Sequence, residues 1–330
     1  MSENRAPIRW GIMGTGKIAG AFTRDLLLNG LHVQAVGSRT RESADRFASS
    51  FDLPTAHASY QSLVDDDSVD VVYIATPHSE HHPNAILALN AGKHLLIEKP
   101  ITVNARQARD LANLSAGRGL TMLEAMWTRF LPHMVHIREV LTAGMIGDVL
   151  TLAADHTQLL PVDPAHRINA LELGGGALLD MGIYPISFAA ELFGTPTSIC
   201  SAATFKATGV DAQVATIFGY ADGGIASTLS STVTKGPNVA TVLGSEGRID
   251  IDAVWYSASG FTIRDNADQV IERFDSDVRG RGMQYQAYEM ESLIRNGKLA
   301  SDVLPPSESV TIMQTLDEVR KQIGLRYPTD

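Results

Sequence analysis

The sequence predicts an N-terminal α/β domain with a doubly wound parallel sheet and a C-terminal α+β domain with a large, open, mostly antiparallel sheet. Three observations predict this. The chain has 330 residues, more than most single hydrophobic cores contain. Strand-like and helix-like segments alternate up to about residue 125, and after that point strand-like segments follow one another closely. We therefore place the domains at residues 1–125 and 126–330.

The N-terminal strands are near-continuous apolar runs, which is typical of a parallel sheet covered on both faces. The clearest is 69–75, which Thr76 and Pro77 close. The expected strands are 8–13, 31–37, 69–75, 93–97 and 120–123. The expected helices are 19–28, 41–50, 83–90 and 102–116, the last with Thr102 as its N-cap.

In the C-terminal part, turn signals such as Asp222-Gly223-Gly224 separate short strands without intervening helices. The expected strands are 198–205, 213–220, 224–233, 239–243, 248–251, 261–263 and 269–274, and the expected helices are 132–143, 175–193, 283–296 and 307–323. Alternation in 213–220 indicates a sheet with one uncovered apolar face. Such a face favours self-association, so we expect a homodimer, with a tetramer as the alternative.

Composition excludes several classes of protein. The chain is 44% hydrophobic and 19% charged, with a net charge of -10. An acidic chain lacks the basic footprint that nucleic acid requires. No apolar run reaches the ~20 residues of a membrane helix, and residues 1–7 do not resemble a signal peptide. The single cysteine, Cys200, excludes an internal disulfide and is expected to be a buried small residue in a strand, so a cytoplasmic location is favoured.

A glycine-rich segment after the first strand predicts a dinucleotide site. Gly14, Gly16 and Ala19 form the pattern G-x-G-x-x-A between a predicted strand and a predicted helix. The first glycine permits a tight turn, the second permits close approach of a pyrophosphate, and Ala19 permits close helix packing. The predicted cofactor-binding residues of this segment are Gly14, Thr15, Gly16, Lys17 and Ile18.

The end of the second strand indicates NADP rather than NAD. An acidic residue there would bind a free ribose 2′-hydroxyl. This chain instead has Ser38 and Arg39, which can hold a 2′-phosphate. The alternative is that Arg39 and Arg41 form a solvated helix start.

Two further loops follow strand ends, where ligands bind in open α/β sheets. We expect cofactor contacts from Thr76, Pro77, His78, His81, Glu98 and Lys99. The histidines His78, His81 and His82 are close in sequence, but without a nearby cysteine we expect no metal site.

Lys99, Asp180 and Tyr184 are the candidate catalytic residues. A lysine at the end of a strand can act on a substrate hydroxyl or carbonyl group. Asp180 and Tyr184 are four residues apart and share one face of a predicted helix, after a glycine run at 174–176 that permits close backbone approach. The alternatives are a structural Asp180 and a Tyr184 that belongs to the core.

These motifs, in this order, resemble the Gfo/Idh/MocA oxidoreductase family over essentially the whole chain. The segments 124–132, 175–184 and 318–321 resemble the branch with dimeric dihydrodiol dehydrogenase and NADP-dependent D-xylose 1-dehydrogenase. The resemblance implies a Rossmann domain and hydride transfer between NADP(H) and a sugar, cyclic polyol or vicinal diol. The alternatives are an NADPH-dependent keto- or anhydrosugar reductase and a non-catalytic NADP-binding regulator.

The resemblance also implies residue roles. Lys99 would be catalytic, and Tyr184 stands where many relatives have histidine. Because tyrosine does not titrate near neutrality, it needs a nearby cation such as Lys99 to lower its pKa. Substrate contacts are expected from Trp127, Arg129, His156 and Arg167, although Trp127 also fits plain packing.

Overall fold

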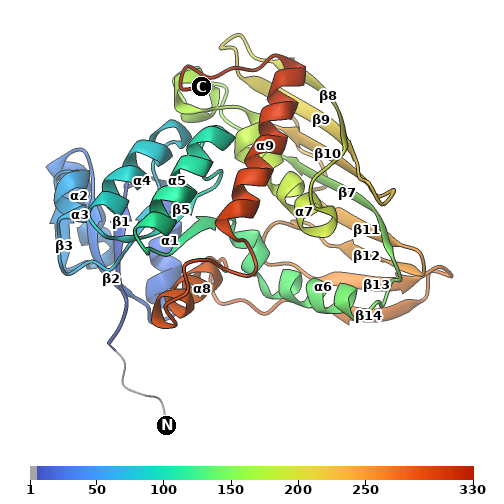
Figure 1. The fold of residues 1–330 in the computed structure, drawn as a ribbon, viewed down its shortest axis with the longest axis horizontal. Helices are drawn as coiled ribbons and strands as arrows, with labels where there is room; N and C mark the ends of the chain where they lie inside the picture. The colour runs from blue at the N-terminus through green and yellow to red at the C-terminus, as the bar shows by residue number, and fades with distance from the viewer. Residues whose placement is uncertain (1–5) are drawn as a thin grey trace. The chain divides into compact units, whose positions relative to one another are not determined.

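The computed structural model describes residues 6–330, and the chain divides into two units (Figure 1). The first comprises Met1–Ile101, Gln107–Trp127 and Arg279–Ser309; the second comprises Thr102–Arg106, Thr128–Val278 and Val310–Asp330. The division proposed from the sequence did not include the return of 279–309 to the first unit. Buried Asp25 explains part of it, because its carboxylate accepts from the backbone N–H groups of Arg281 and Met283 at 3.0 and 2.9 Å.

The first unit contains a six-stranded parallel sheet in the order β3-β2-β1-β4-β5-β6. The strands are β1 (Arg9–Met13), β2 (His32–Gly37), β3 (Thr55–His57), β4 (Val71–Ile74), β5 (His94–Glu98) and β6 (Met122–Ala125). The helices are α1 (Lys17–Leu28), α2 (Arg41–Phe51), α3 (Tyr60–Val64), α4 (His81–Asn90), α5 (Ala105–Gly117) and α8 (Gln284–Arg295). The order confirms the doubly wound prediction.

Three local differences from the sequence predictions have physical causes. β3 and α3 were not predicted, because three and five residues are too short for a periodic signal. α5 begins at Ala105, three residues later than expected. Thr102 is therefore not its N-cap; its hydroxyl donates to the Asn104 carbonyl at 2.8 Å.

The second unit contains an eight-stranded mixed sheet in the order β14-β13-β12-β11-β7-β10-β9-β8. Its strands are β7 (Val149–Thr157), β8 (Ser198–Phe205), β9 (Asp211–Gly219), β10 (Ile225–Ser231), β11 (Ala240–Gly244), β12 (Gly247–Ile251), β13 (Phe261–Asp265) and β14 (Val270–Phe274). Its helices are α6 (Pro132–Thr142), α7 (Ile183–Phe193) and most of α9 (Pro306–Ile323). Short 3₁₀ turns occur at His78–Glu80, Trp127–Phe130, Arg167–Asn169 and Leu171–Leu173 along the chain.

The sequence analysis missed β7, a central strand of this sheet. β7 pairs in parallel with β10 and antiparallel with β11. Its alternation is carried by small residues such as Ala153 and Ala154 and ends in polar ones, which weakens the periodic signal. All other pairs in the sheet are antiparallel, so the prediction of a mostly antiparallel sheet is confirmed.

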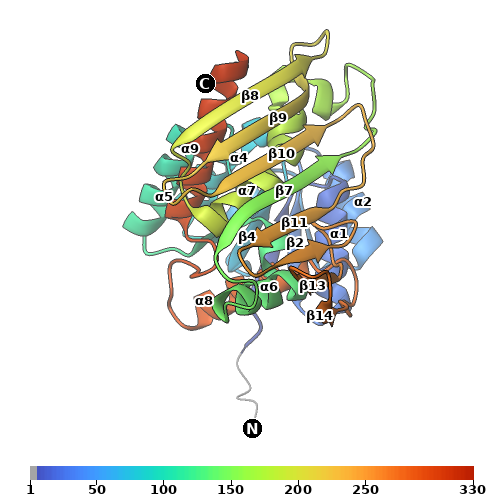
Figure 2. The ribbon, with the colours of Figure 1, turned by 90° about the vertical axis from the view of Figure 1, so that its right-hand side faces the viewer.

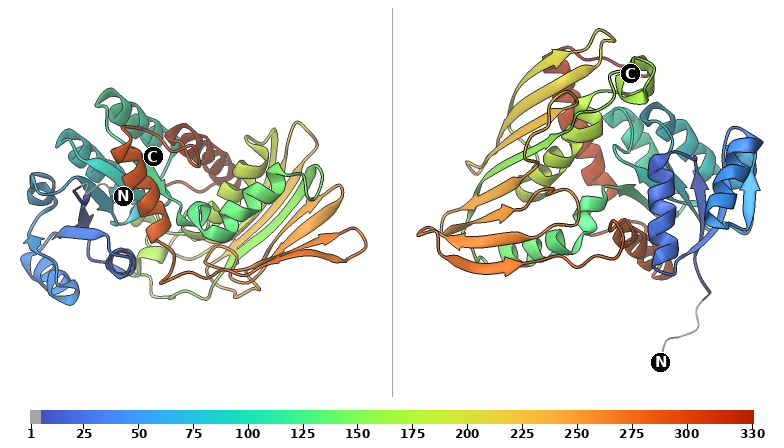
Figure 3. Two further views of the ribbon diagram at one scale, coloured as in Figure 1. Left: turned by 90° about the horizontal axis from the view of Figure 1, so that it is seen from below. Right: turned by 180° about the vertical axis from the view of Figure 1, so that it is seen from behind.

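Helices cover only one face of the eight-stranded sheet (Figures 2 and 3). The opposite face exposes Ile217, Ile225 and Leu229, with 56%, 50% and 42% of their surface accessible. Cys200 lies opposite Ile217 and is exposed, so the expectation of a buried cysteine was wrong, because alternate residues of this edge strand point away from the helices. The stretch Leu171–Phe193 is long and apolar enough to cross a membrane, but 78% of an 18-residue apolar window within it is buried, as in a core helix.

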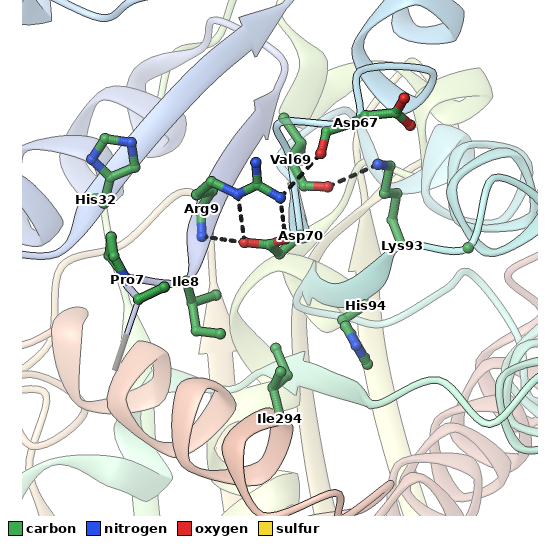
Figure 4. A pocket seen from close by; sticks show the side chains of 12 residues that line it. Pro7, Ile8, Arg9, His32, Asp67, Val69, Asp70, Lys93, His94 and Ile294 are labelled. Atoms are coloured by element: carbon green, nitrogen blue, oxygen red, sulfur yellow. Dashed lines mark hydrogen bonds and ion pairs between the residues drawn. The ribbon is translucent and has the colours of Figure 1, made fainter. Parts of the chain in front are cut away.

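A cavity of about 680 Å³ opens at the amino-terminal ends of the parallel strands (Figure 4). The side chains of Arg9, Asp70 and Lys93 in its lining already have partners. Arg9 pairs with Asp70 at 2.7 Å, and Lys93 donates to the carbonyl oxygens of Asp66 and Val69, both at 2.8 Å. Ligands of open α/β sheets bind at the opposite, carboxyl-terminal edge, where the predicted residues lie.

Candidate functional site

The glycine loop between β1 and α1 has the geometry of a dinucleotide-binding turn. Gly14 has φ +110°, and a Cβ there would lie 2.9 Å from the Ala75 carbonyl oxygen, so only glycine fits. Gly16 is the N-cap of α1; a Cβ there would meet nothing within 4 Å, and no side chain caps the helix. The start of α1 therefore has room beside Gly16 and no side-chain cap, which suits a pyrophosphate.

The two arginines that follow β2, Arg39 and Arg41, differ in their contacts. Arg41 is the first residue of α2, and its guanidinium donates to the Ala56 carbonyl at 2.7 Å. Arg39 lies before Thr40, the N-cap of that helix, and makes no hydrogen bond or ion pair with residues 6–330. Burial raises the pKa of Tyr60, and the charge of nearby Arg39 opposes this rise. Arg39 is thus an exposed cation outside the helix, beside buried Ser38.

His81 joins the loops that follow β4 and β5. Its Nδ1 lies 2.8 Å from the Pro100 carbonyl oxygen and its Nε2 2.9 Å from that of Thr76. Complete burial lowers the pKa of His81 to about 3, so the ring is neutral and donates to one carbonyl at a time. This fully buried ring holds the two loops together.

Glu98 fixes the backbone that carries Lys99. The Tyr73 hydroxyl donates to one carboxylate oxygen of Glu98, and the Lys99 N–H donates to the other at 3.2 Å. Thr76, which accepts from Asn84 at 3.2 Å, and Pro77 lie half-buried beside buried His78. Lys99 is half-buried at the carboxyl end of β5.

The predicted histidine cluster does not converge on one point. His82 pairs with Asp110 at 2.7 Å on the surface, away from the carbonyl groups that His81 contacts. Within residues 6–330, no group of three histidine, cysteine or acidic side chains could hold a metal ion.

In the second unit, Asp180 and Tyr184 lie on two joined helical segments. Asp180 belongs to a single π-helical turn, Leu178–Gly182, and Tyr184 to the first turn of α7. Such turns are frequent at functional sites. Asp180 forms an ion pair with Arg167 at 3.3 Å, and about half of the Arg167 side chain is exposed. The structure thus brings together Arg167 and Asp180, which the sequence analysis proposed separately.

The rings of His156 and Tyr256 pack around Tyr184. His156, near the end of β7, packs edge-on against Tyr184 with ring centroids 4.9 Å apart. Tyr256 stacks on His156 at 3.6 Å. The amide nitrogen of Gln158 lies 2.9 Å from Nε2 of His156 and 3.2 Å from the Tyr256 hydroxyl.

The sequence analysis missed Tyr256 and Gln158. Tyr256 follows Trp255, whose ring is fully buried and whose indole donates to the Asp155 carbonyl at 2.7 Å. That anchor, together with Thr128, which donates to the Tyr256 carbonyl at 2.7 Å, holds the loop after β12. The only signal in the sequence was a Trp-Tyr pair in a predicted loop. Gln158 could have been inferred by extending the alternation of β7.

Two residues expected at the substrate are deeply buried. Arg129 is 2% exposed, and its guanidinium donates to the Ser187 carbonyl at 2.6 Å and pairs with Glu191 at 3.3 Å. These contacts favour a role in holding α7, which carries Tyr184. In the first unit, Trp127 is 5% exposed, and the Arg281 guanidinium lies 5.6 Å from its ring centre.

Comparisons with known proteins agree with the folds of the two units. Residues 8–125 match a family model described as the oxidoreductase family with an NAD-binding Rossmann fold, and residues 134–250 match the GFO/IDH/MocA C-terminal domain. Mouse (Mus musculus) trans-1,2-dihydrobenzene-1,2-diol dehydrogenase is 36% identical over 98% of this chain and 99% of its own. The D-xylose 1-dehydrogenase (NADP(+)) of Hypocrea jecorina is 35% identical over 99% and 95%.

The solved structures include a 3-ketoreductase from Actinomadura kijaniata in complex with NADP. It superposes with a TM-score of 0.85 at 26% identity and covers 96% of this chain and 98% of its own.

The two glycines of the loop should respond differently to alanine. Gly14→Ala places a Cβ at 2.9 Å from Ala75 in a backbone conformation that alanine avoids, so we expect a loss of stability of about 1–3 kcal/mol. Gly16→Ala has room and an ordinary φ of -77°, so stability should change little while dinucleotide binding weakens. Thermal unfolding and a fluorescence titration with NADPH measure both. Equal stability losses would contradict the geometry.

Proposed function

This chain belongs to the Gfo/Idh/MocA oxidoreductase family, and we propose that it transfers a hydride between NADP(H) and a sugar, a cyclic polyol or a vicinal diol. The observation that carries this proposal is the group of polar and aromatic side chains around Tyr184: the Arg167–Asp180 pair and the stacked rings of His156 and Tyr256. Such convergence of polar groups on aromatic faces is typical of small-molecule sites. The dehydrogenases that are similar to this chain act on a dihydrodiol and on D-xylose.

Each residue has a defined part in the oxidative direction. When bound, NADP supplies the hydride acceptor. Tyr184 takes the proton of the substrate hydroxyl, and the positive charge of Lys99 favours the phenolate that does so. Asp180, oriented by Arg167, accepts a hydrogen bond from a second hydroxyl of the substrate. In the reverse direction Tyr184 returns the proton to the carbonyl oxygen.

The glycine loop and the end of β2 are the groups that would hold the cofactor. The N-terminus of α1 at Gly16 suits the pyrophosphate, and Ser38 with Arg39 suits a 2′-phosphate. The xylose dehydrogenase and the 3-ketoreductase support NADP over NAD, since both are described with NADP.

The alternative is an NADPH-dependent reductase of a keto- or anhydrosugar, which the likeness to a 3-ketoreductase favours. A non-catalytic regulator is disfavoured because Lys99 and Tyr184 are both present. A cytoplasmic location stays a prediction from the sequence.

A second copy of the chain is the partner we propose for the uncovered sheet face. Ile217, Ile225 and Leu229 alternate along β9 and β10 and form an apolar surface that no helix covers. An apolar sheet face of this kind is typical of an interface between identical chains.

Tyr184→Phe tests the function directly. A panel of aldoses, polyols and diols with NADP+ first identifies a substrate by absorbance of the reduced nicotinamide. On that substrate we expect kcat to fall about 10²- to 10⁴-fold, because the proton acceptor is lost. NADPH affinity should change little. Tyr220→Phe, the same change at a stacked tyrosine beside Phe193, is the control; an unchanged rate in the Tyr184 variant would refute its role.

Arg39→Ala tests the choice of cofactor. Loss of a charge-assisted contact to the 2′-phosphate should weaken NADP+ about 10- to 100-fold while NAD+ affinity stays nearly constant. Arg41→Ala is the matched control, since that guanidinium already donates to Ala56. Calorimetric titration with each nucleotide gives the ratio; an equal loss for both nucleotides would favour a solvated surface arginine.

Leu229→Glu tests the sheet interface. A carboxylate in the middle of an apolar interface is buried without a partner, so the oligomer should dissociate. Leu299→Glu, at a residue of the first unit with the same 42% exposure, is the control. Light scattering after size exclusion measures the mass; no difference between the two variants would rule out this face.

A further inference from the structure

A fully buried carboxylate lies beneath the glycine run that precedes Asp180. Asp211 is the first residue of β9, and one of its oxygens accepts from the Leu178 N–H at 2.6 Å. A Cβ at Gly176 would lie 1.9 Å from the other oxygen, and φ there is +119°. The carboxylate and Gly176 therefore fit only because position 176 has no side chain. Leu178 begins the π-helical turn that contains Asp180.

The same glycine run is held from its other side by the turn that carries Arg167. Gly175 donates to the Ala170 carbonyl at 3.0 Å, and Gly176 to the Ile168 carbonyl at 3.0 Å. A Cβ at Gly175 would lie 2.7 to 2.9 Å from three carbonyl oxygens of residues 167–170. The glycine run is thus enclosed between Asp211 and the segment that aligns Arg167 with Asp180.

The hairpin of β8 and β9 also holds the Arg167 turn directly. Lys206, just after β8, donates to the Asn169 side-chain oxygen at 2.6 Å. The Asn169 amide in turn donates to the carbonyl oxygens of Pro161 and Asp163, both at 2.8 Å. One hairpin therefore fixes both segments that meet in the ion pair of Arg167 and Asp180.

Ionising the fully buried carboxyl group of Asp211 costs free energy. Burial raises the pKa of Asp211 to about 6, against the backbone N–H groups and the charge of Lys206, which lower it. The other groups that act on this region are Tyr327, Arg320, Asp330 and Asp180, and burial keeps Tyr327 protonated by raising its pKa well above the usual value. Tyr327 donates to the Gly175 carbonyl at 2.8 Å. Residues that are buried at such a cost in free energy are found most often at functional sites.

We propose that ionised Asp211 is a positioning residue, which holds the Gly174–Leu178 backbone so that Asp180 and Tyr184 are aligned for reaction. Its protonation weakens this alignment and lowers turnover. The inference rests on the roles proposed for Asp180 and Tyr184. The ionised carboxylate accepts charge-assisted hydrogen bonds from the backbone N–H groups at the start of the turn. A protonated carboxyl keeps an oxygen that can accept, but it has lost the negative charge, so protonation weakens these hydrogen bonds.

The test is the pH profile of kcat for Asp211→Asn, in the direction of carbonyl reduction, where Tyr184 acts in its protonated form. The wild type should lose kcat below about pH 6, where Asp211 is protonated. Asp211→Asn should have a kcat lowered about 10- to 100-fold, no loss of its own in that pH range, and unchanged NADPH affinity. Asp222→Asn, at an exposed residue of the turn between β9 and β10, is the control and should keep the wild-type profile. An unaltered acid limb in Asp211→Asn overturns the proposal.

Lys206→Met serves as a second variant if Asp211→Asn does not fold. Removing the cation should raise the pKa of Asp211, so the acid limb should move to higher pH; a limb that stays in place overturns the proposal. A merely structural lysine would lower activity without moving the limb.

Thermal unfolding gives a readout that needs no substrate. Because the pKa of Asp211 in the folded protein lies above the ordinary aspartate value of 3.8, the wild type should lose stability as pH rises from about 4 to 6, and Asp211→Asn should not. If no substrate is turned over, the proposed function has failed, and this difference alone decides whether Asp211 titrates in the turn. Identical curves for both proteins overturn the proposal.

Discussion

The parallel register of β1 with β4, and of β4 with β5, is the constraint on which the first unit depends. It brings the carboxyl ends of three strands to one edge of the sheet, so that the glycine loop, Thr76 and Lys99 follow strands that are neighbours in space. The contact between Gly14 and Ala75 is a direct consequence, because adjacent strand ends leave no room for a Cβ. His81 then ties two of these loops together through their carbonyl groups.

In the second unit, polar groups are held at the helix-covered face of a sheet. β7 and α7 supply His156 and Tyr184, and the loop after β12 supplies Tyr256. Buried charges keep these elements in place: Arg129 pairs with Glu191 on α7, and Asp211 accepts from the turn before it. Each removal of a charge from water costs free energy, and each here supports a segment that carries a candidate reactive group.

Membership of the family accounts for the pairing of a dinucleotide-binding unit with an open sheet. In the proposed function, the residues around Tyr184 decide which substrate is accepted. His156, Gln158 and Tyr256 form a polar and aromatic surface, so the site offers both a flat face for a ring and donors for hydroxyl groups. A fold hosts many reactions, and the chemistry is decided by such side chains rather than by the sheet that holds them.

The sequence alone predicted a doubly wound parallel sheet, a second, mostly antiparallel sheet and a glycine loop between the first strand and the first helix, because glycine spacing and apolar periodicity are local properties. It also pointed to Lys99, Asp180 and Tyr184 through a resemblance of ordered motifs. Only the tertiary structure decided that Arg167 meets Asp180, that Tyr256 and Gln158 meet His156, that Arg129 is buried against α7, and that Cys200 is exposed. These contacts join residues that are 2 to 100 positions apart on different strands, helices and loops. Side-chain direction and strand pairing, which no local pattern encodes, bring them together.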